Sequence, residues 1–200
     1  DNYWNGEIGD SIRKKFAAPV DGLPQEEPLF TLNQYPTKVF EGFVRKSRNI
    51  IIISKSNKTG FSATKDAYAK PQNVFLISGK TTEDVLKLLE EKSAEIIKTI
   101  KASEIIENQV RMTKSLISDA QIQKKFGVSL KIGFGYKYDM VKDKFIWLRK
   151  EFTSGYNSIL IYEVPIEQIE KDGNVIANII QMRDAIGKEN IQQIIFLFFK

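Results

Sequence analysis

The sequence of 200 residues contains no cysteine and no histidine. Without cysteine, the chain can form no internal disulfide, no cysteine-ligated zinc or iron–sulfur site and no thiol nucleophile. Without histidine, it lacks the commonest general base and transition-metal ligand, so no Ser-His-Asp triad can be built within it. Any catalysis would depend on Asp, Glu, Lys, Tyr or Ser, or on a hard metal ion. No motif for a cofactor or a metal ion is complete in the sequence, and we expect neither.

Long apolar runs are also missing, since no segment approaches the roughly 20 apolar residues of a membrane helix. The chain begins at Asp1 without an apolar leader. We expect any membrane association to come through a lipid anchor outside this chain. The composition is otherwise globular, with 42% hydrophobic and 28% charged residues and a net charge of +5. This basic balance modestly favours polyanionic partners.

Hydrophobic periodicity and turn residues predict the order of elements in the first half of the chain. The predicted elements, in order, are a helix over 3–17, a proline-rich loop over 19–36 pinned by Leu29, Phe30, Leu32 and Tyr35, strands over 38–46 and 48–54, a loop over 55–70, a strand over 73–78 and a long helix from 81 to about 116. The run Ile50–Ile53 is β-branched throughout, which is typical of a strand buried on both faces. Thr81 and Asp84 form a plausible capping pair for the long helix.

The second half begins with a short helix between Asp119 and Gly127. A three-stranded antiparallel meander follows, over 128–140, 144–152 and 157–164, and then a helical region from Pro165, broken at 172–174 and ended by Gly187. This order predicts an α+β fold: a mainly antiparallel sheet with helices packed on one face, incomplete at both termini. We expect a single domain over 1–190. The tail 191–200, IQQIIFLFFK, is atypically apolar and is either a final buried strand or a foreign end.

Two groups of basic residues are candidates for binding a polyanion: Arg45, Lys46 and Arg48 between two predicted strands, and Lys131, Lys137 and Arg149 in the meander. If these segments form adjacent strands, their side chains share one positive face. The segment around Phe134 and Tyr136 partly matches a strand motif that stacks RNA bases on aromatic rings. Residues 132, 137 and 139 do not fit that motif, and we do not expect nucleic acid as the partner. The alternative is a solvated surface of mixed charge.

Four carboxylates are candidates for acid–base catalysis or cation binding: Asp139, Asp143, Glu151 and Asp172. For catalysis, at least two of these carboxylates would have to lie in one cleft. The alternative is that Asp occurs in these turns only because its side chain forms hydrogen bonds with the nearby backbone. Ser78-Gly79-Lys80-Thr81 resembles the end of a phosphate loop, but Val74 stands where that motif needs glycine. A weak anion site at this helix start remains an alternative.

Four stretches together resemble a known family: DSIRKKFAAPVDGLPQEEPLFTLNQYP at 10–36, GFVRKSRNI at 42–50, FIWLRKEF at 145–152 and ILIYEVP at 159–165. They resemble the domain of unknown function 4837, found in envelope lipoproteins of Bacteroidetes-type bacteria, over roughly 1–190. The resemblance implies a lipid-anchored domain facing the periplasm or cell surface, and supplies no catalytic residue. We expect a non-enzymatic binding or structural role, with a protein or an envelope polymer as partner. One alternative is a carboxylate-based hydrolase or metal-binding enzyme acting on envelope glycans. The other is a domain that binds single-stranded nucleic acid or another polyanion.

Overall fold

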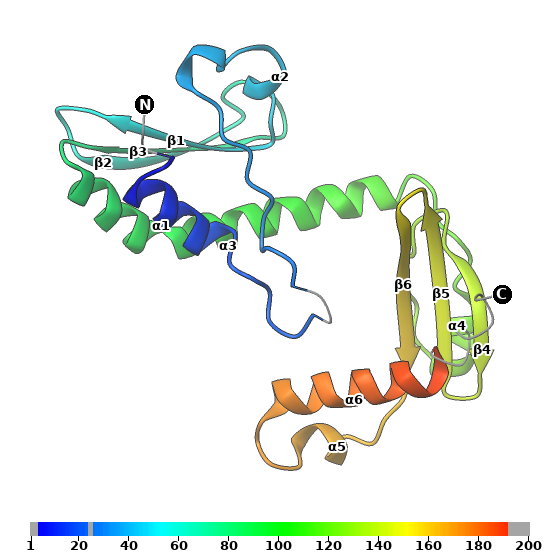
Figure 1. The fold of residues 1–200 in the computed structure, drawn as a ribbon. Coiled ribbons are helices and arrows are strands. Elements are labelled where there is room, and N and C mark those ends of the chain that lie inside the picture. Colours follow the sequence, from blue (N-terminus) through cyan, green and yellow to red (C-terminus); the bar gives the residue numbers. More distant parts are fainter. Residues whose placement is uncertain (1–3, 24–25, 192–200) are drawn as a thin grey trace. The chain divides into compact units, whose positions relative to one another are not determined.

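The computed structural model describes residues 4–23 and 26–191 (Figure 1). The chain forms two compact units, Asp1–Asn108 and Gln109–Lys200. Each unit contains helices and a three-stranded sheet, so the predicted α+β class is confirmed, with the strands divided between two sheets. The expectation of a single domain over 1–190 stays a prediction. The apolar tail, apart from Ile191, lies outside the described residues.

The first unit places two helices on one face of a sheet (Figure 1). Its elements are α1 (Glu7–Phe16), η1 (Thr37–Val39), α2 (Gly42–Arg45), β1 (Asn49–Lys55), β2 (Gly60–Lys65), β3 (Asn73–Gly79) and α3 (Thr82–Met112), which crosses the unit boundary. The strand order is β1-β3-β2, with β1 parallel and β2 antiparallel to β3. Helices α1 and α3 and strand β3 supply the buried side chains of one shared core.

Helix α3 forms because its apolar residues recur on one side of the helix. Val85, Leu89, Ile96 and Ile100 are buried in the first core. The predicted capping pair is confirmed: Thr81 Oγ1 accepts the Asp84 N–H at 3.2 Å, and the Asp84 carboxylate accepts the Thr81 N–H at 3.1 Å. These bonds satisfy amides that have no partner inside the helix.

A polar network joins β1, β3 and α3 at one end of this sheet. The Asn73 amide group, 6% exposed, donates to Asn49 Oδ1 and to Ser103 Oγ, both at 2.8 Å. The Asn49 amide in turn donates to Glu104 at 2.8 Å. The network fastens the first residues of both parallel strands to the helix.

Four predictions for this unit are wrong. Residues 38–46 form η1 and α2 instead of a strand, because Gly42 adopts a left-handed φ of +53° that an extended chain does not use. The predicted loop over 55–70 contains β2, whose outer residues are polar and exposed because it is an edge strand. Strand β1 is also an edge strand and is only partly buried, with Ile51 and Ile53 packed against the core. Phe30 and Leu32 pack there as predicted, but Tyr35 is 43% exposed.

The second unit contains the predicted meander. Its elements are α4 (Ala120–Phe126), β4 (Lys137–Lys142), β5 (Phe145–Phe152), β6 (Gly155–Tyr162), α5 (Glu167–Glu170) and α6 (Val175–Asn190). Neighbouring strands pair antiparallel in the order β4-β5-β6, and β4 begins at Lys137, later than predicted. Ile122, Ile132, Ile146 and Leu148 form its core. Gly187 does not end α6, because it keeps a helical backbone and accepts a hydrogen bond from Ile191 N–H.

Candidate binding surface

The first basic group belongs to α2 and the start of β1, in the first unit. The Arg45 guanidinium lies 4.3 Å from the ring centroid of Tyr68, and Lys46 is exposed. Arg48 donates to both oxygens of Glu104, at 2.9 and 2.7 Å, and this pairing raises the pKa of Arg48. The Arg48 charge is therefore already balanced. Because this group and the meander lie in different sheets, the two segments do not form adjacent strands.

The meander gathers a second group around Arg149 of β5. Arg149 Nε lies 2.6 Å from Asp139 Oδ2, and its Nη2 lies 3.2 Å from Glu151 Oε1. Its guanidinium carbon lies 5.5 Å from the Trp147 ring centroid and 5.6 Å from that of Tyr156. We call these residues the Arg149 cluster: Asp139, Trp147, Arg149, Glu151 and Tyr156.

Strand geometry explains why the Arg149 cluster forms. Alternation along β5 places Trp147, Arg149 and Glu151 on one face of the sheet, and the β5–β6 register puts Tyr156 directly opposite Glu151. The β4–β5 register shifts between Tyr138 and Met140, which leaves Asp139 unpaired at a bulge. Bulges commonly redirect a side chain in this way.

The side chains of the Arg149 cluster differ in how much of their surface is exposed to solvent. Trp147 is buried, and its Nε1 donates to Ser158 Oγ at 2.9 Å. Tyr156 is 50% exposed, and the Glu151 side chain is 71% exposed. A ligand would therefore meet the Tyr156 ring and the carboxylate first, with Arg149 behind them. One cation faces two carboxylates, so the cluster carries no excess positive charge.

The other predicted residues of this group lie outside the Arg149 cluster. Lys137 is exposed and pairs with Arg149 across the β4–β5 ladder. Lys131 is exposed in the segment before β4, and Phe134 is 71% exposed. Tyr136 packs against the second core, with Lys150 Nζ 6.0 Å from its ring centroid. One of the two aromatic candidates is thus engaged in packing.

The four candidate carboxylates do not share a cleft. Asp139 and Glu151 are linked only through ion pairs with the same guanidinium, that of Arg149. Asp143 lies in the β4–β5 turn, at the other end of that hairpin. Asp172 accepts hydrogen bonds from Asn174 N–H and from the Asn178 amide, and these bonds lower its pKa. Over residues 4–23 and 26–191, no group of three or more acidic side chains is placed to hold a metal ion.

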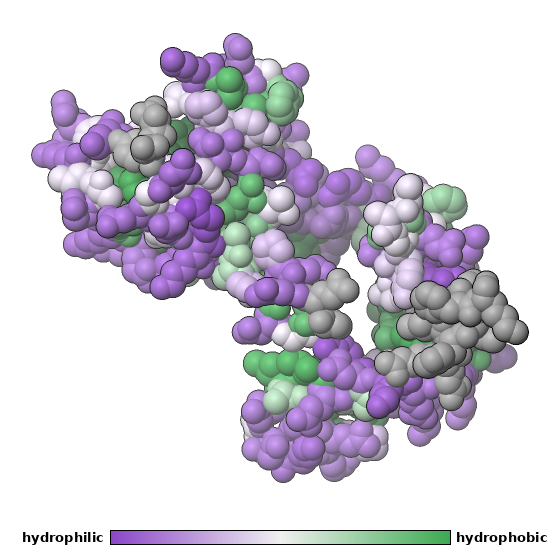
Figure 2. Space-filling model, viewed as in Figure 1, coloured by the Kyte–Doolittle hydropathy of each residue, from purple (hydrophilic) through white to green (hydrophobic). Residues whose placement is uncertain are grey.

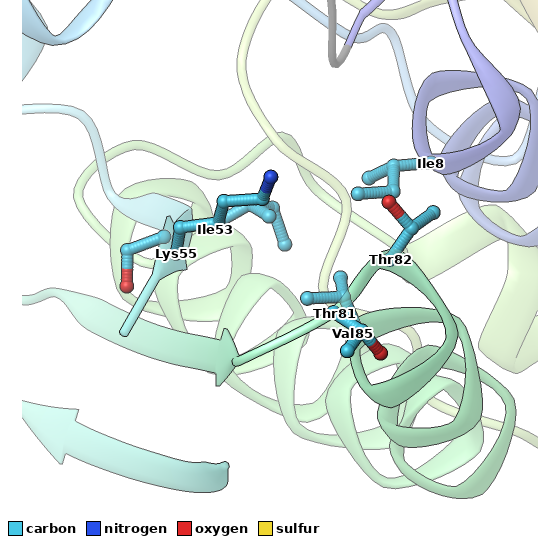
Figure 3. A pocket seen from close by; sticks show the side chains of 7 residues that line it. Ile8, Ile53, Lys55, Thr81, Thr82 and Val85 are labelled. Carbon is cyan, nitrogen blue, oxygen red and sulfur yellow. The ribbon is translucent and has the colours of Figure 1, made fainter. Parts of the chain in front are cut away.

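In the segment that resembles a phosphate loop, the backbone amides bind a carboxylate of the protein itself, that of Asp84. The Asp84 carboxylate accepts hydrogen bonds from the amides of Lys80 and Thr81 and from the Thr59 hydroxyl. These bonds, the Thr81 amide first, lower the pKa of Asp84. The neighbouring pocket, lined by Ile8, Ile53, Ser54, Lys55, Thr81, Thr82 and Val85, is small (Figure 3). Among the residues that line this pocket, only Lys55 is charged, and it is the last residue of the edge strand β1.

Comparisons with known families divide the chain close to the boundary between the units. Residues 1–113 match a domain of unknown function (DUF8532), and residues 115–193 match a domain of unknown function (DUF4837). The chain belongs to the DUF8532 family, and its DUF8532 domain is followed by a region that matches DUF4837. The predicted resemblance to DUF4837 is confirmed for 115–193, whereas the stretches at 10–36 and 42–50 fall within the DUF8532 match. Neither the curated proteins nor the solved structures gave a significant match.

Both families are described as domains of unknown function, so the matches assign no activity to the chain. No helix in the described part of the DUF8532–DUF4837 chain is long and apolar enough to cross a bilayer. Sequence reasoning singled out Asp139, Arg149 and Glu151 separately and missed Tyr156. The length of the β5–β6 turn would have revealed it, because that turn sets Glu151 opposite Tyr156.

Proposed function

We propose that this protein is a non-enzymatic domain of the bacterial cell envelope that binds an envelope glycan polymer at the Arg149 cluster. The observation that carries the proposal is the half-exposed Tyr156 ring beside a fixed arginine and two carboxylates. Sugar rings present apolar C–H faces and hydroxyls that both donate and accept. An aromatic face with a few oriented polar groups suits such a ligand. The envelope location, as part of a lipoprotein, rests on the family resemblance.

The pairing of the carboxylates supports binding rather than hydrolysis. A glycosidase needs one carboxyl held protonated and a second one free to attack or to activate water. Here Asp139 and Glu151 both form ion pairs with the same Arg149 guanidinium, which leaves neither carboxylate free of a partner. Asp143 and Asp172 serve turns elsewhere in the unit. A polyanion fits less well, because the charge of Arg149 is already matched.

Co-sedimentation with purified peptidoglycan sacculi tests the proposal. We expect the full chain to pellet with sacculi, and Tyr156→Ala to weaken binding about tenfold, as expected for loss of an exposed stacking ring. Phe134→Ala is the matched control, because the Phe134 ring is 71% exposed but lies outside the Arg149 cluster. Binding that is absent, or that survives Tyr156→Ala, contradicts the proposal. Release of soluble fragments that Glu151→Gln abolishes would establish the hydrolase instead.

A further inference from the structure

A second exposed surface lies on the first unit, around α2. Its rings pack edge to face: Tyr35 with Phe43 at 6.2 Å between centroids, and Phe40 with Tyr68 at 5.4 Å. Phe43 is 76% exposed, the highest value among the large apolar side chains of the described residues. We define the aromatic knob as these rings and the neighbouring half-exposed valine: Tyr35, Val39, Phe40, Phe43 and Tyr68. An apolar surface of this kind, held out in water, indicates an interaction site.

The aromatic knob is held in a fixed conformation by buried polar bonds. The Gln72 side chain, 3% exposed, donates to the backbone carbonyls of Arg45 and Ser47 at 2.8 and 2.7 Å. Its Oε1 accepts the Tyr68 N–H at 2.9 Å. Gln72 thus joins the end of α2 to the loop that carries Tyr68. Figure 1 shows α2 on the side of the sheet opposite α3, and Figure 2 shows apolar residues among hydrophilic ones in that region.

Several cations lie close to the aromatic knob in the sequence. The segment 35–47 contains Lys38, Arg45 and Lys46 against one carboxylate, Glu41. The guanidinium carbon of Arg45 lies 4.3 Å from the Tyr68 ring centroid, so the Arg45 charge is in contact with a ring of the knob. Within the described residues, neither Lys38 nor Lys46 forms an ion pair. The surface therefore combines exposed aromatic rings with net positive charge.

This composition selects one class of partner. Aromatic rings settle at the headgroup level of a bilayer, and nearby Lys and Arg side chains are attracted to anionic phosphates. A stable protein interface, in contrast, uses roughly 20–30 residues on each side, many more than the aromatic knob offers. We propose that the aromatic knob is a contact site for anionic phospholipid headgroups at a membrane surface.

Flotation with unilamellar vesicles tests this assignment in the full chain. We expect binding to phosphatidylcholine vesicles that contain phosphatidylglycerol, and clearly weaker binding to phosphatidylcholine alone. Phe43→Ser should weaken binding about tenfold through lost apolar contact, and Lys46→Ser about fivefold, as expected for one cation near an anionic surface. Phe134→Ser is the matched control, because Phe134 is 71% exposed but lies in the second unit. The apolar residues 191–200 are present in every variant, so the comparison cancels their contribution.

Three outcomes would overturn the assignment of the aromatic knob to a membrane surface. They are no vesicle binding by the full chain, binding that is unaffected by Phe43→Ser, and an equal loss with Phe134→Ser. Binding that does not depend on phosphatidylglycerol or on Lys46 contradicts the recognition of anionic headgroups. If vesicles do not bind but Phe43→Ser removes a crosslinked protein, the aromatic knob is a protein interface. Thermal unfolding of each variant confirms that its fold is intact.

Discussion

Helix α3 carries isoleucines that are fully buried and isoleucines that are exposed, which allows burial to be varied at constant chemistry. Ile96 is 0% exposed in the first core, whereas Ile106, in the same helix, is 57% exposed. An Ile→Val change has the same intrinsic helix propensity cost at both positions, so this cost cancels in the comparison. Ile96→Val removes one buried methylene, and should lower the free energy of unfolding by about 1 kcal/mol. Ile106→Val should cost less than about 0.5 kcal/mol, as at most surface sites.

Urea unfolding followed by far-UV circular dichroism measures both effects. With a slope of about 1.5 kcal/mol per molar, Ile96→Val should lower the midpoint of the transition by about 0.7 M. Ile106→Val should lower it by under about 0.3 M on the same slope. Equal shifts, or a larger shift for Ile106→Val, would refute the assignment of the buried face of α3.

Further predictions concern local packing, buried hydrogen bonds and acid stability. Gly79→Ala should lower stability by about 1–3 kcal/mol through overpacking, because the new methyl would lie 2.8 Å from Asp84 Cβ. Gly60→Ala, in the same sheet, should not lower stability through overpacking, because the atom nearest to its new methyl would lie 4.0 Å away. Asn178→Ala should cost about 1–3 kcal/mol in urea unfolding, because this buried amide donates to a backbone carbonyl and a carboxylate. Hydrogen bonds from Ser129 and other donors lower the pKa of Asp119 below its unfolded value of 3.8, so they stabilise the fold above that pH. The difference in Tm between the wild type and Asp119→Asn should therefore shrink as the pH falls below 3.8, and a constant difference would contradict this.

Local patterns were sufficient to predict the elements whose signal lies in neighbouring residues. Helix α3 was recognised because a stripe of apolar residues follows a Thr81–Asp84 cap. The β5–β6 hairpin was recognised because a polar turn separates two runs of alternating residues. In both cases the residues that form the element also bury its apolar face, so the sequence pattern and the packing agree.

Elements that depend on distant partners could not be predicted in the same way. Strand β2 is polar because it lies at a sheet edge, and its place is set by backbone pairing to β3 rather than by its own side chains. Residues 38–46 look like a strand because Val39, Phe40, Phe43 and Val44 are strand formers, whereas the left-handed Gly42 redirects the chain. The Arg149 cluster required the β5–β6 register and a bulge at Asp139, and neither is visible in a single segment.

The polar network at the start of β1 has a consequence for strand alignment. Four consecutive isoleucines, Ile50–Ile53, offer β3 nearly identical surfaces, and a slip of two residues would keep every side chain on its original face. Asn49 removes this ambiguity, because its side chain meets Asn73, which is also bonded to Ser103 of α3. A shifted strand would leave the buried Asn73 amide without its partner, at a cost of about 1–3 kcal/mol. A chain with both asparagines replaced by alanine could still pair its isoleucines, but in more than one alignment.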